Sequence, residues 1–142
     1  MPFTSKSDVL RGNVSAITKN DVSIVTQRQA ITAVAADIAL NAVGALAILP
    51  AGCIPVGVYV DGEGSLACDI GIVNDAETAI STAAADGGAA WVTATAANGN
   101  TILTTKTIVR VAPSNVDRKV GLRVTTAGAV GTLGLTLQYR QA

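Results

Sequence analysis

The chain has 142 residues, a length that suits one domain, and 49% of them are apolar, which is enough to form a core. Only 3% are aromatic, so this core must consist mainly of Ala, Val, Ile and Leu, and we expect a modestly stable chain that works in an oligomer or a larger assembly. Ten basic and ten acidic residues cancel without a basic cluster, which argues against nucleic acid and membrane surfaces as partners.

The chain begins with a polar stretch that has too few apolar residues to form a core. We predict an N-terminal arm over residues 1–20, followed by one domain over residues 21–142. The arm is either a frayed terminus or an extended segment that orders against a partner, with Phe3 as its anchor and Lys6 and Arg11 as polar contacts. The stretch lacks the apolar segment of a signal peptide, so we expect the chain to be made and kept in a reducing cytoplasm.

The stretch Ala42–Val60 is free of charge over nineteen residues, about the length of a membrane-spanning helix. Pro50, Gly52, Pro55 and Gly57 interrupt it, and in a helix interior each Pro costs about 3 kcal/mol and each Gly about 1 kcal/mol. On both sides of the Leu-Pro-Ala-Gly segment, apolar residues recur at every second position, as they do in strands. The stretch therefore predicts two buried strands joined by a turn.

Further strands are predicted by β-branched or alternating residues on both sides of this stretch. Ser23–Ala36 forms one long strand or two short ones, and Val56–Val73 forms a hairpin that turns at Asp61–Gly64. The pattern breaks at Asp75–Ala85, where a short helix that Asp75 caps and a long loop are equally consistent with the sequence. Thr101–Val111 is predicted to be a strand.

The last part of the chain contains two regular alternations, over residues 119–126 and 130–140. Tyr139 is expected to point inward with its hydroxyl at the rim of the core. The other residues predicted to point inward here are Val120, Leu122, Val124, Leu133, Leu135 and Leu137. With about eight short strands and turns between them, the chain is predicted to be an all-β, antiparallel β-sandwich of the jelly-roll type.

No set of residues predicts a catalytic, cofactor or metal site. The chain has no histidine, which removes the commonest general base and most zinc sites. Cys53 and Cys68 are too far apart in sequence for a C-x-x-C motif, and we predict two free, partly buried thiols, with a disulfide as the alternative. We therefore expect no enzyme and no cofactor.

Two weak motif matches occur near the predicted hairpin turn. Gly62–Ala67 loosely matches a dinucleotide-binding fingerprint, but a strand pattern follows it where that fingerprint needs a helix. A calcium-loop template lacks its required Gly, at Leu66, and its required Glu, at Ile72. The residues that do match this template are Asp61, Glu63, Ser65 and Asp69, and we interpret them as a solvated hairpin tip.

Trp91, the single tryptophan, follows a tract of small residues. It either fills the core beneath a loop or anchors an interface, because Trp is frequent at the centres of protein interfaces. We include it, with Phe3, Lys6 and Arg11, among the candidate partner contacts.

Two stretches carry a resemblance to a known family. Ala47–Asp75 contains the Leu-Pro-Ala-Gly turn, the strand after it and a hairpin whose second strand reads Ile-Gly-Ile, and Lys119–Ala142 is an Ala-, Gly- and Thr-rich stretch that contains Tyr139-Arg140. Together with the polar arm, they resemble the small cement or decoration proteins of tailed-bacteriophage heads, over about residues 30–142.

The resemblance implies a jelly roll or related β-sandwich without catalytic residues or cofactor. Such a protein would be made in the bacterial host cytoplasm and would bind the outer surface of an assembled capsid, where it clamps neighbouring major capsid subunits. It would also associate with itself, as a homodimer for preference and otherwise as a homotrimer.

Two other functions stay open from the sequence. A receptor- or carbohydrate-binding β-sandwich of a virion fibre or tail would suit the fold, although the chain has few aromatic residues for a sugar platform. A small β-barrel enzyme or lipid carrier is the other alternative, and the absence of histidine argues against it.

Overall fold

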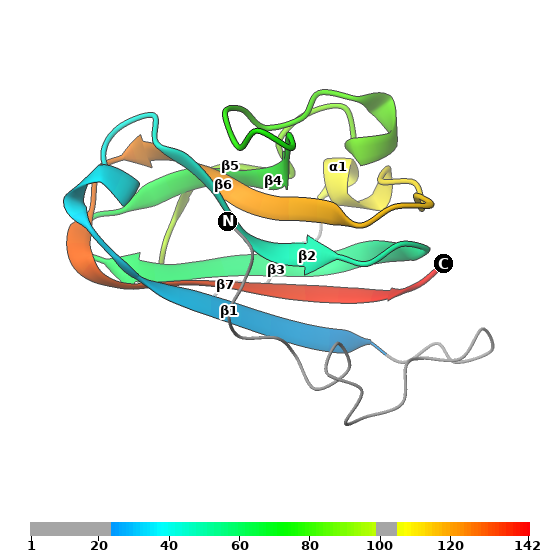
Figure 1. The fold of residues 1–142 in the computed structure, drawn as a ribbon, viewed down its shortest axis with the longest axis horizontal. Helices are drawn as coiled ribbons and strands as arrows, with labels where there is room; N and C mark the ends of the chain where they lie inside the picture. Colours follow the sequence, from blue (N-terminus) through cyan, green and yellow to red (C-terminus); the bar gives the residue numbers. More distant parts are fainter. Residues whose placement is uncertain (1–23, 99–104) are drawn as a thin grey trace.

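The computed structural model describes residues 24–98 and 105–142, so the predicted arm, with Phe3, Lys6 and Arg11, lies outside the described residues. The described part is a sandwich of two antiparallel sheets (Figure 1). One sheet has the strand order β1-β7-β3 and the other has the order β2-β6-β4-β5. The strands are β1 (Val25–Ala33), β2 (Val43–Leu49), β3 (Cys53–Glu63), β4 (Ala67–Val73), β5 (Val92–Ala96), β6 (Arg118–Thr126) and β7 (Ala129–Gln141).

In this topology, strands from the start of the chain pair with strands from its end. β1 and β3 flank β7 in one sheet, while β2 and β4 flank β6 in the other. From β1 to β4 the chain alternates between the two sheets. β5 and β6 then stay in the sheet of β4, and β7 returns to the other sheet, which is the winding of a jelly roll. The predicted fold class is confirmed, with seven strands in the described residues where about eight were expected.

The uncharged stretch forms two strands, as predicted. β2 ends at Leu49 and β3 begins at Cys53, whose N–H donates to the Pro50 carbonyl at 3.1 Å to close the turn. Gly52 has a φ of +78°, a conformation that costs glycine little because it has no Cβ. Among the described residues, no helix is both long enough and apolar enough to cross a membrane.

The core lies between the sheets and follows the predicted alternation. The inward residues of β4, β6 and β7 are all buried, as are Val58 and Val60 of β3. β2 departs from strict alternation because a bulge between Ala45 and Ala47 turns Leu46 inward as well. The Tyr139 ring is buried as expected, but its hydroxyl oxygen is buried too, so the predicted position at the rim is wrong.

The described part of the predicted strand Thr101–Val111 is instead a short helix, α1 (Lys106–Val109), while residues 101–104 lie outside the described residues. The Thr105 hydroxyl caps this helix by accepting a hydrogen bond from the Ile108 N–H at 3.1 Å. Ile108 is buried in the core. The cap and this single buried side chain outweigh the strand propensity of the β-branched residues.

The loop alternative is the one observed for Asp75–Ala85, which contains only the first part of a short 3-10 helix, η2 (Ala84–Asp86). The side-chain oxygen of Asn74 accepts a hydrogen bond from the Thr78 N–H at 2.8 Å, and the backbone carbonyl of Asn74 accepts one from the Glu77 N–H. This turn around Asn74 satisfies backbone donors locally, so they need no helical partners.

One further boundary and one further strand differ from the prediction. β3 continues through Asp61 to Glu63, so the hairpin turns three residues later than predicted, around Gly64 with its φ of +73°. β5 was not predicted, and in the structure it is irregular, since its burial does not alternate and Ala94 has a φ of +48°. The Asp69 carboxylate of β4 accepts the Ala94 N–H at 2.8 Å and thereby holds this irregular strand against the sheet. A second 3-10 helix, η1 (Ala35–Asp37), follows β1.

Candidate functional site

Three connections meet at one end of the sandwich, and we call them together the loop end: residues 50–52, residues 74–91 and residues 105–117. Backbone hydrogen bonds join them, from the Ala112 N–H to the Ala85 carbonyl at 2.9 Å and from the Gly52 N–H to the Ser114 carbonyl at 2.7 Å. The chain also ends here (Figure 1), and the Ala142 N–H donates to the Gly52 carbonyl at 3.0 Å. The loop end is therefore a connected surface rather than three separate loops.

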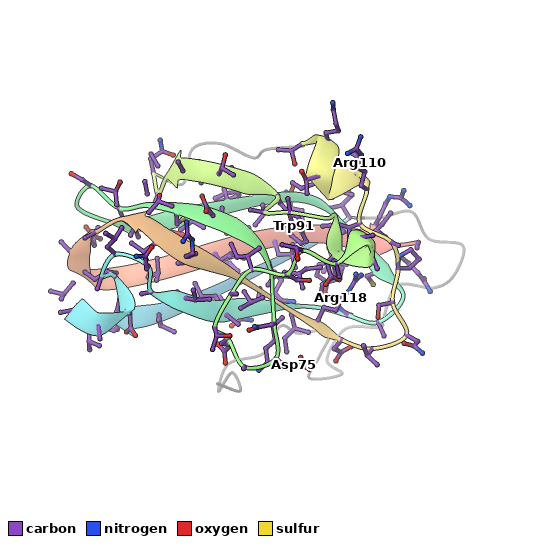
Figure 2. All side chains as sticks on the ribbon, turned by 90° about the horizontal axis from the view of Figure 1, so that it is seen from above. Asp75, Trp91, Arg110 and Arg118 are labelled. Atoms are coloured by element: carbon purple, nitrogen blue, oxygen red, sulfur yellow. The ribbon has the colours of Figure 1, made fainter. Side chains whose placement is uncertain are left out.

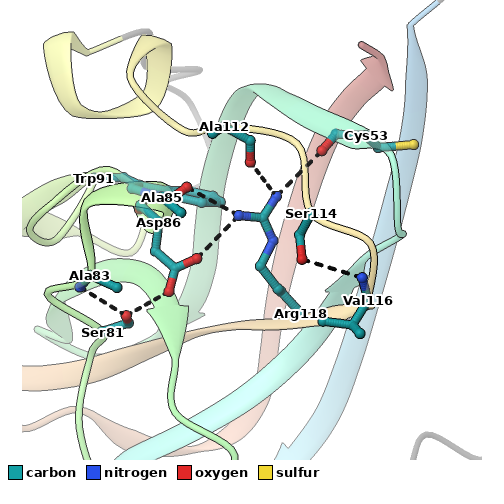
Figure 3. A network of polar contacts seen from close by, with 10 residues as sticks. All are labelled: Cys53, Ser81, Ala83, Ala85, Asp86, Trp91, Ala112, Ser114, Val116 and Arg118. Carbon is teal, nitrogen blue, oxygen red and sulfur yellow. Dashed lines mark hydrogen bonds and ion pairs between the residues drawn. The ribbon is translucent and has the colours of Figure 1, made fainter.

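Arg118, the first residue of β6, lies at the centre of the loop end (Figure 3). Its side chain is only 8% exposed and forms an ion pair with Asp86, Nη1 to Oδ1, at 3.1 Å. The guanidinium also donates to the carbonyls of Ala85 at 3.2 Å, Ala112 at 2.8 Å and Cys53 at 3.5 Å. One side chain thus ties together loop 74–91, segment 105–117 and the start of β3.

Asp86 accepts from a second group as well as from Arg118. The Ser81 hydroxyl donates to Asp86 Oδ2 at 2.6 Å and accepts the Ala83 N–H at 3.2 Å (Figure 3). Both carboxylate oxygens are therefore used, and loop 74–91 is held in one conformation although small residues dominate its sequence.

Trp91 lies in the core beneath these loops, in agreement with one of the two alternatives drawn from the sequence (Figure 2). Its side chain is 2% exposed, and the indole N–H donates to the Asp86 carbonyl at 3.0 Å. The Trp91 carbonyl accepts from the Thr105 hydroxyl, which also caps α1, at 2.7 Å. Trp91 is therefore too deeply buried to touch a partner directly, and it can affect a partner contact only by holding these loops in place.

The outer edge of β2 is occupied by side chains. The Gln27 amide donates to the Ile48 carbonyl at 3.2 Å and accepts the Ile48 N–H at 3.1 Å, while the Glu77 carboxylate accepts the Ala45 N–H at 2.8 Å. These contacts replace the backbone pairing that an added strand would make. β2 is therefore a poor acceptor for a strand from a neighbouring protein.

Both cysteines are free, as predicted. Burial raises the pKa of the Cys68 thiol to about 12, with a smaller contribution from the nearby Asp69 carboxylate. Burial also raises the pKa of Cys53, again helped by a carboxylate, that of Asp117. Both sulfurs are thus held as neutral thiols, which are weak nucleophiles and poor metal ligands.

The described residues form hollows beside the sheets, and two of them are large enough to describe. A cavity of about 220 Å³ lies between β1 and β2, with Ile31, Leu46 and Leu133 among its lining residues. An open groove of about 470 Å³ lies where loop 74–91 crosses the outer face of the four-stranded sheet, with Asp69 and Arg123 in its wall. In the described ranges, no group of three or more Cys, Asp or Glu residues is arranged to hold a metal ion.

The residues that organise the loop end could not be recognised from the sequence. Arg118 follows a loop and precedes an alternating strand, so no sequence signal separates it from an ordinary surface arginine. The sequence contains a weak signal for α1, because Thr105 is a favourable N-cap residue and Arg110 a favourable basic residue at the helix C-terminus. Of the predicted contacts, the structure places Trp91 alone, since Phe3, Lys6 and Arg11 lie outside the described residues.

The geometry defines the class of this protein as a jelly-roll β-sandwich with a rigid loop end. Its fold is similar to that of a chain in the capsid of Ralstonia phage GP4, with a TM-score of 0.64 over 96% of both chains and 22% sequence identity. At this identity the likeness establishes a common fold. A chain of the cyanophage Pam1 capsid asymmetric unit aligns over the full length of both chains at 16% identity, but its TM-score of 0.44 is too low to establish a common fold. No protein-family model and no curated protein matches the sequence.

Proposed function

We propose that this chain is a structural protein of a phage virion: a cement or decoration protein that binds the outer surface of the capsid and clamps neighbouring major capsid subunits. The observation that carries the proposal is the jelly roll shared, over 96% of both chains, with a chain of the Ralstonia phage GP4 capsid.

The chemistry of the loop end agrees with a role in adhesion. The buried polar groups at its centre, Arg118 and Asp86, pair with one another. A surface whose loops are fixed before binding loses little conformational entropy when a partner covers it. A protein that binds the assembled shell and not its free subunits stabilises the shell by mass action, and one copy that bridges two subunits gains from effective concentration.

The proposal is tested with capsids of the phage that encodes the chain, prepared without this protein. The purified chain should co-sediment with these capsids at a fixed ratio to the major capsid protein, and cryo-electron microscopy should place it on the outer surface. The decorated capsids should also withstand higher temperatures than bare ones.

Two outcomes would contradict the proposal. One is a chain that stays in the supernatant at concentrations well above that of the capsid subunits. The other is specific binding to immobilised glycans without binding to capsids, which would favour a receptor- or carbohydrate-binding role.

Light scattering after size exclusion gives the oligomeric state, for which we expect a homodimer, or otherwise a homotrimer.

A further inference from the structure

α1 projects from the loop end and exposes three side chains on one face. Lys106, Val109 and Arg110 are separated by three and four positions, a spacing that places residues side by side on a helix. All three are exposed, and Val109 is 67% exposed, the highest value among the exposed large apolar residues of the described part. Figure 2 shows α1 on the outside of the sandwich with Arg110 at its end. We call these three residues the α1 ridge.

The two cations of the α1 ridge differ from most other basic residues of the described part. Four of those residues form ion pairs with a carboxylate: Arg28 with Asp61, Arg118 with Asp86, Lys119 with Glu77 and Arg123 with Asp69. Arg140 is half-buried and donates to the Gln141 carbonyl. Within residues 24–98 and 105–142, neither Lys106 nor Arg110 has a carboxylate within ion-pair distance. The ridge therefore presents two positive charges that no carboxylate of the described residues neutralises.

The α1 ridge is held rigidly although α1 is only four residues long. Ile108 between its members is buried, and the Thr105 cap ties the helix to the Trp91 carbonyl. Directly after the helix, Ala112 is held by hydrogen bonds to Ala85 and Arg118. Gly87, with a φ of +105°, allows the neighbouring loop to lie against Thr107, because a Cβ there would come within 2.9 Å of the Thr107 carbonyl oxygen. The ridge keeps its shape without a partner, so little entropy is lost when it binds one.

We propose that the α1 ridge is a contact surface for an acidic face of another protein subunit, in which two carboxylates flank an apolar depression that receives Val109. This inference rests on the proposed function, which makes that subunit a major capsid protein. Charge complementarity supports a protein partner with carboxylates, and the exposed valine between the cations fits a depression in a folded surface. A nucleic acid is the weaker fit, because a phosphate-driven site needs more cations than two in a chain of zero net charge.

The test compares two double variants in the co-sedimentation experiment described above, with the chain otherwise intact. K106Q/R110Q should bind capsids at least about tenfold more weakly than the wild type, because it removes both charges of the ridge. R28Q/R123Q is the matched control, since it changes the net charge equally at exposed pairs away from the ridge, and it should bind within about twofold of the wild type. K106R/R110K, which keeps both charges, should also bind like the wild type.

The salt dependence provides a second measurement. Wild-type binding should weaken as NaCl rises from 50 to 500 mM, and K106Q/R110Q should show a smaller dependence. K106Q/R110Q and K106R/R110K should unfold at the same urea concentration as the wild type, because the altered side chains are exposed. R28Q/R123Q loses two ion pairs and should unfold at a slightly lower urea concentration.

Each outcome supports or overturns a defined statement. If the wild type binds and K106Q/R110Q binds equally well, the α1 ridge is not the contact and the proposed function stands. If the wild type does not bind capsids, the proposed function fails and this inference fails with it. If K106Q/R110Q loses binding to double-stranded DNA while its binding to capsids is unchanged, the partner is a nucleic acid and the inference is overturned.

Discussion

At the scale of single residues, Arg118 is the side chain on which the loop end depends most. It is a buried cation with one carboxylate partner and three carbonyl partners from separate connections. A guanidinium suits this position because its planar fork donates in several directions at once, which a lysine ammonium cannot do in the same geometry.

Arg118→Ala should lower the free energy of unfolding by about 3–5 kcal/mol, because it leaves Asp86 without its buried cationic partner and removes one donor from each of three carbonyls. Urea unfolding followed by circular dichroism measures the change. Arg123→Ala, which removes a side chain that is 44% exposed and lies 3.5 Å from Asp69, should cost about 1 kcal/mol or less and serves as the control. Equal losses in the two variants would show that the Arg118 network does not stabilise the loop end.

Cys68 gives the stability of the chain a dependence on alkaline pH. Its thiol has a pKa of about 12 in the folded chain against an ordinary value of 9.0, so the folded state holds a proton that the unfolded state releases between these values. Stability is therefore fully present below about pH 9 and falls as the pH rises towards 12, at a rate of up to about 1.4 kcal/mol per pH unit for this one proton. Burial of Tyr139 raises its pKa and adds to the loss above pH 10.

Cys68→Ala should flatten this alkaline loss of stability, even though the smaller side chain lowers stability at neutral pH. Urea midpoints measured between pH 7 and pH 11 test the expectation. Cys53→Ala is the matched control, because Cys53 is only half-buried, and it should leave more of the slope in place. A Cys68→Ala chain with an unchanged slope would contradict the assignment.

At the scale of elements, the contact between β2 and β6 depends on the absence of a side chain at Gly121. A Cβ at this position would lie 2.0 Å from the Gly44 carbonyl oxygen and 2.7 Å from the Ala45 Cα, both backbone atoms that cannot move without breaking the pairing. Gly44 lies beside Gly121 on β2, and a Cβ added to Gly44 would have no atom within 4 Å.

Gly121→Ala should therefore lower the free energy of unfolding by about 3 kcal/mol or more through steric conflict with the β2 backbone. Gly44→Ala should change it by less than about 1 kcal/mol, because no atom lies within contact distance of the new methyl group. Thermal or urea unfolding of the two variants decides between a steric and a purely conformational role. The expectation is wrong if the two substitutions have the same effect.

α1 shows how tertiary contacts override the local preference of an element. Its residues are rich in threonine, isoleucine and valine, which favour strands, yet the Thr105 cap and the buried Ile108 fix a helical turn. The formation of a helix instead of a strand also changes the surface. A strand would direct successive side chains to two opposite faces. The helix instead gathers Lys106, Val109 and Arg110 on one exposed face.

At the scale of the whole molecule, the jelly roll separates the function of the core from that of the connections. The core between the sheets buries most of the large apolar residues of the described part, while the loop end carries the polar network and the α1 ridge. A fold of this kind needs no reactive site in order to act as an adhesive part of an assembly.

The N-terminal arm is predicted to be dispensable for folding but not for assembly. Deletion of Met1–Asn20 should leave the urea midpoint near that of the full chain, because this stretch has too few apolar residues to form a core. The same deletion should weaken binding to capsids in the co-sedimentation assay, since the arm is expected to order against a partner. A deletion variant that unfolds, or one that binds as tightly as the full chain, would refute this role.

The amino-acid sequence by itself determined the all-β class, the two strands and turn within Ala42–Val60, the inward faces of β4, β6 and β7, and the free cysteines. These features depend on neighbouring residues: alternation sets which side chains face the core, and Pro and Gly set where a strand stops.

Only the tertiary structure decided which strands pair, that Thr105–Val109 folds as a capped helix, and that Arg118 is buried. β1 pairs with β7 although nearly the whole chain separates them, and Arg118 receives its partners from connections far from it in sequence. Local patterns carry no information about such contacts, because their free energy arises only after distant segments have come together in the folded chain.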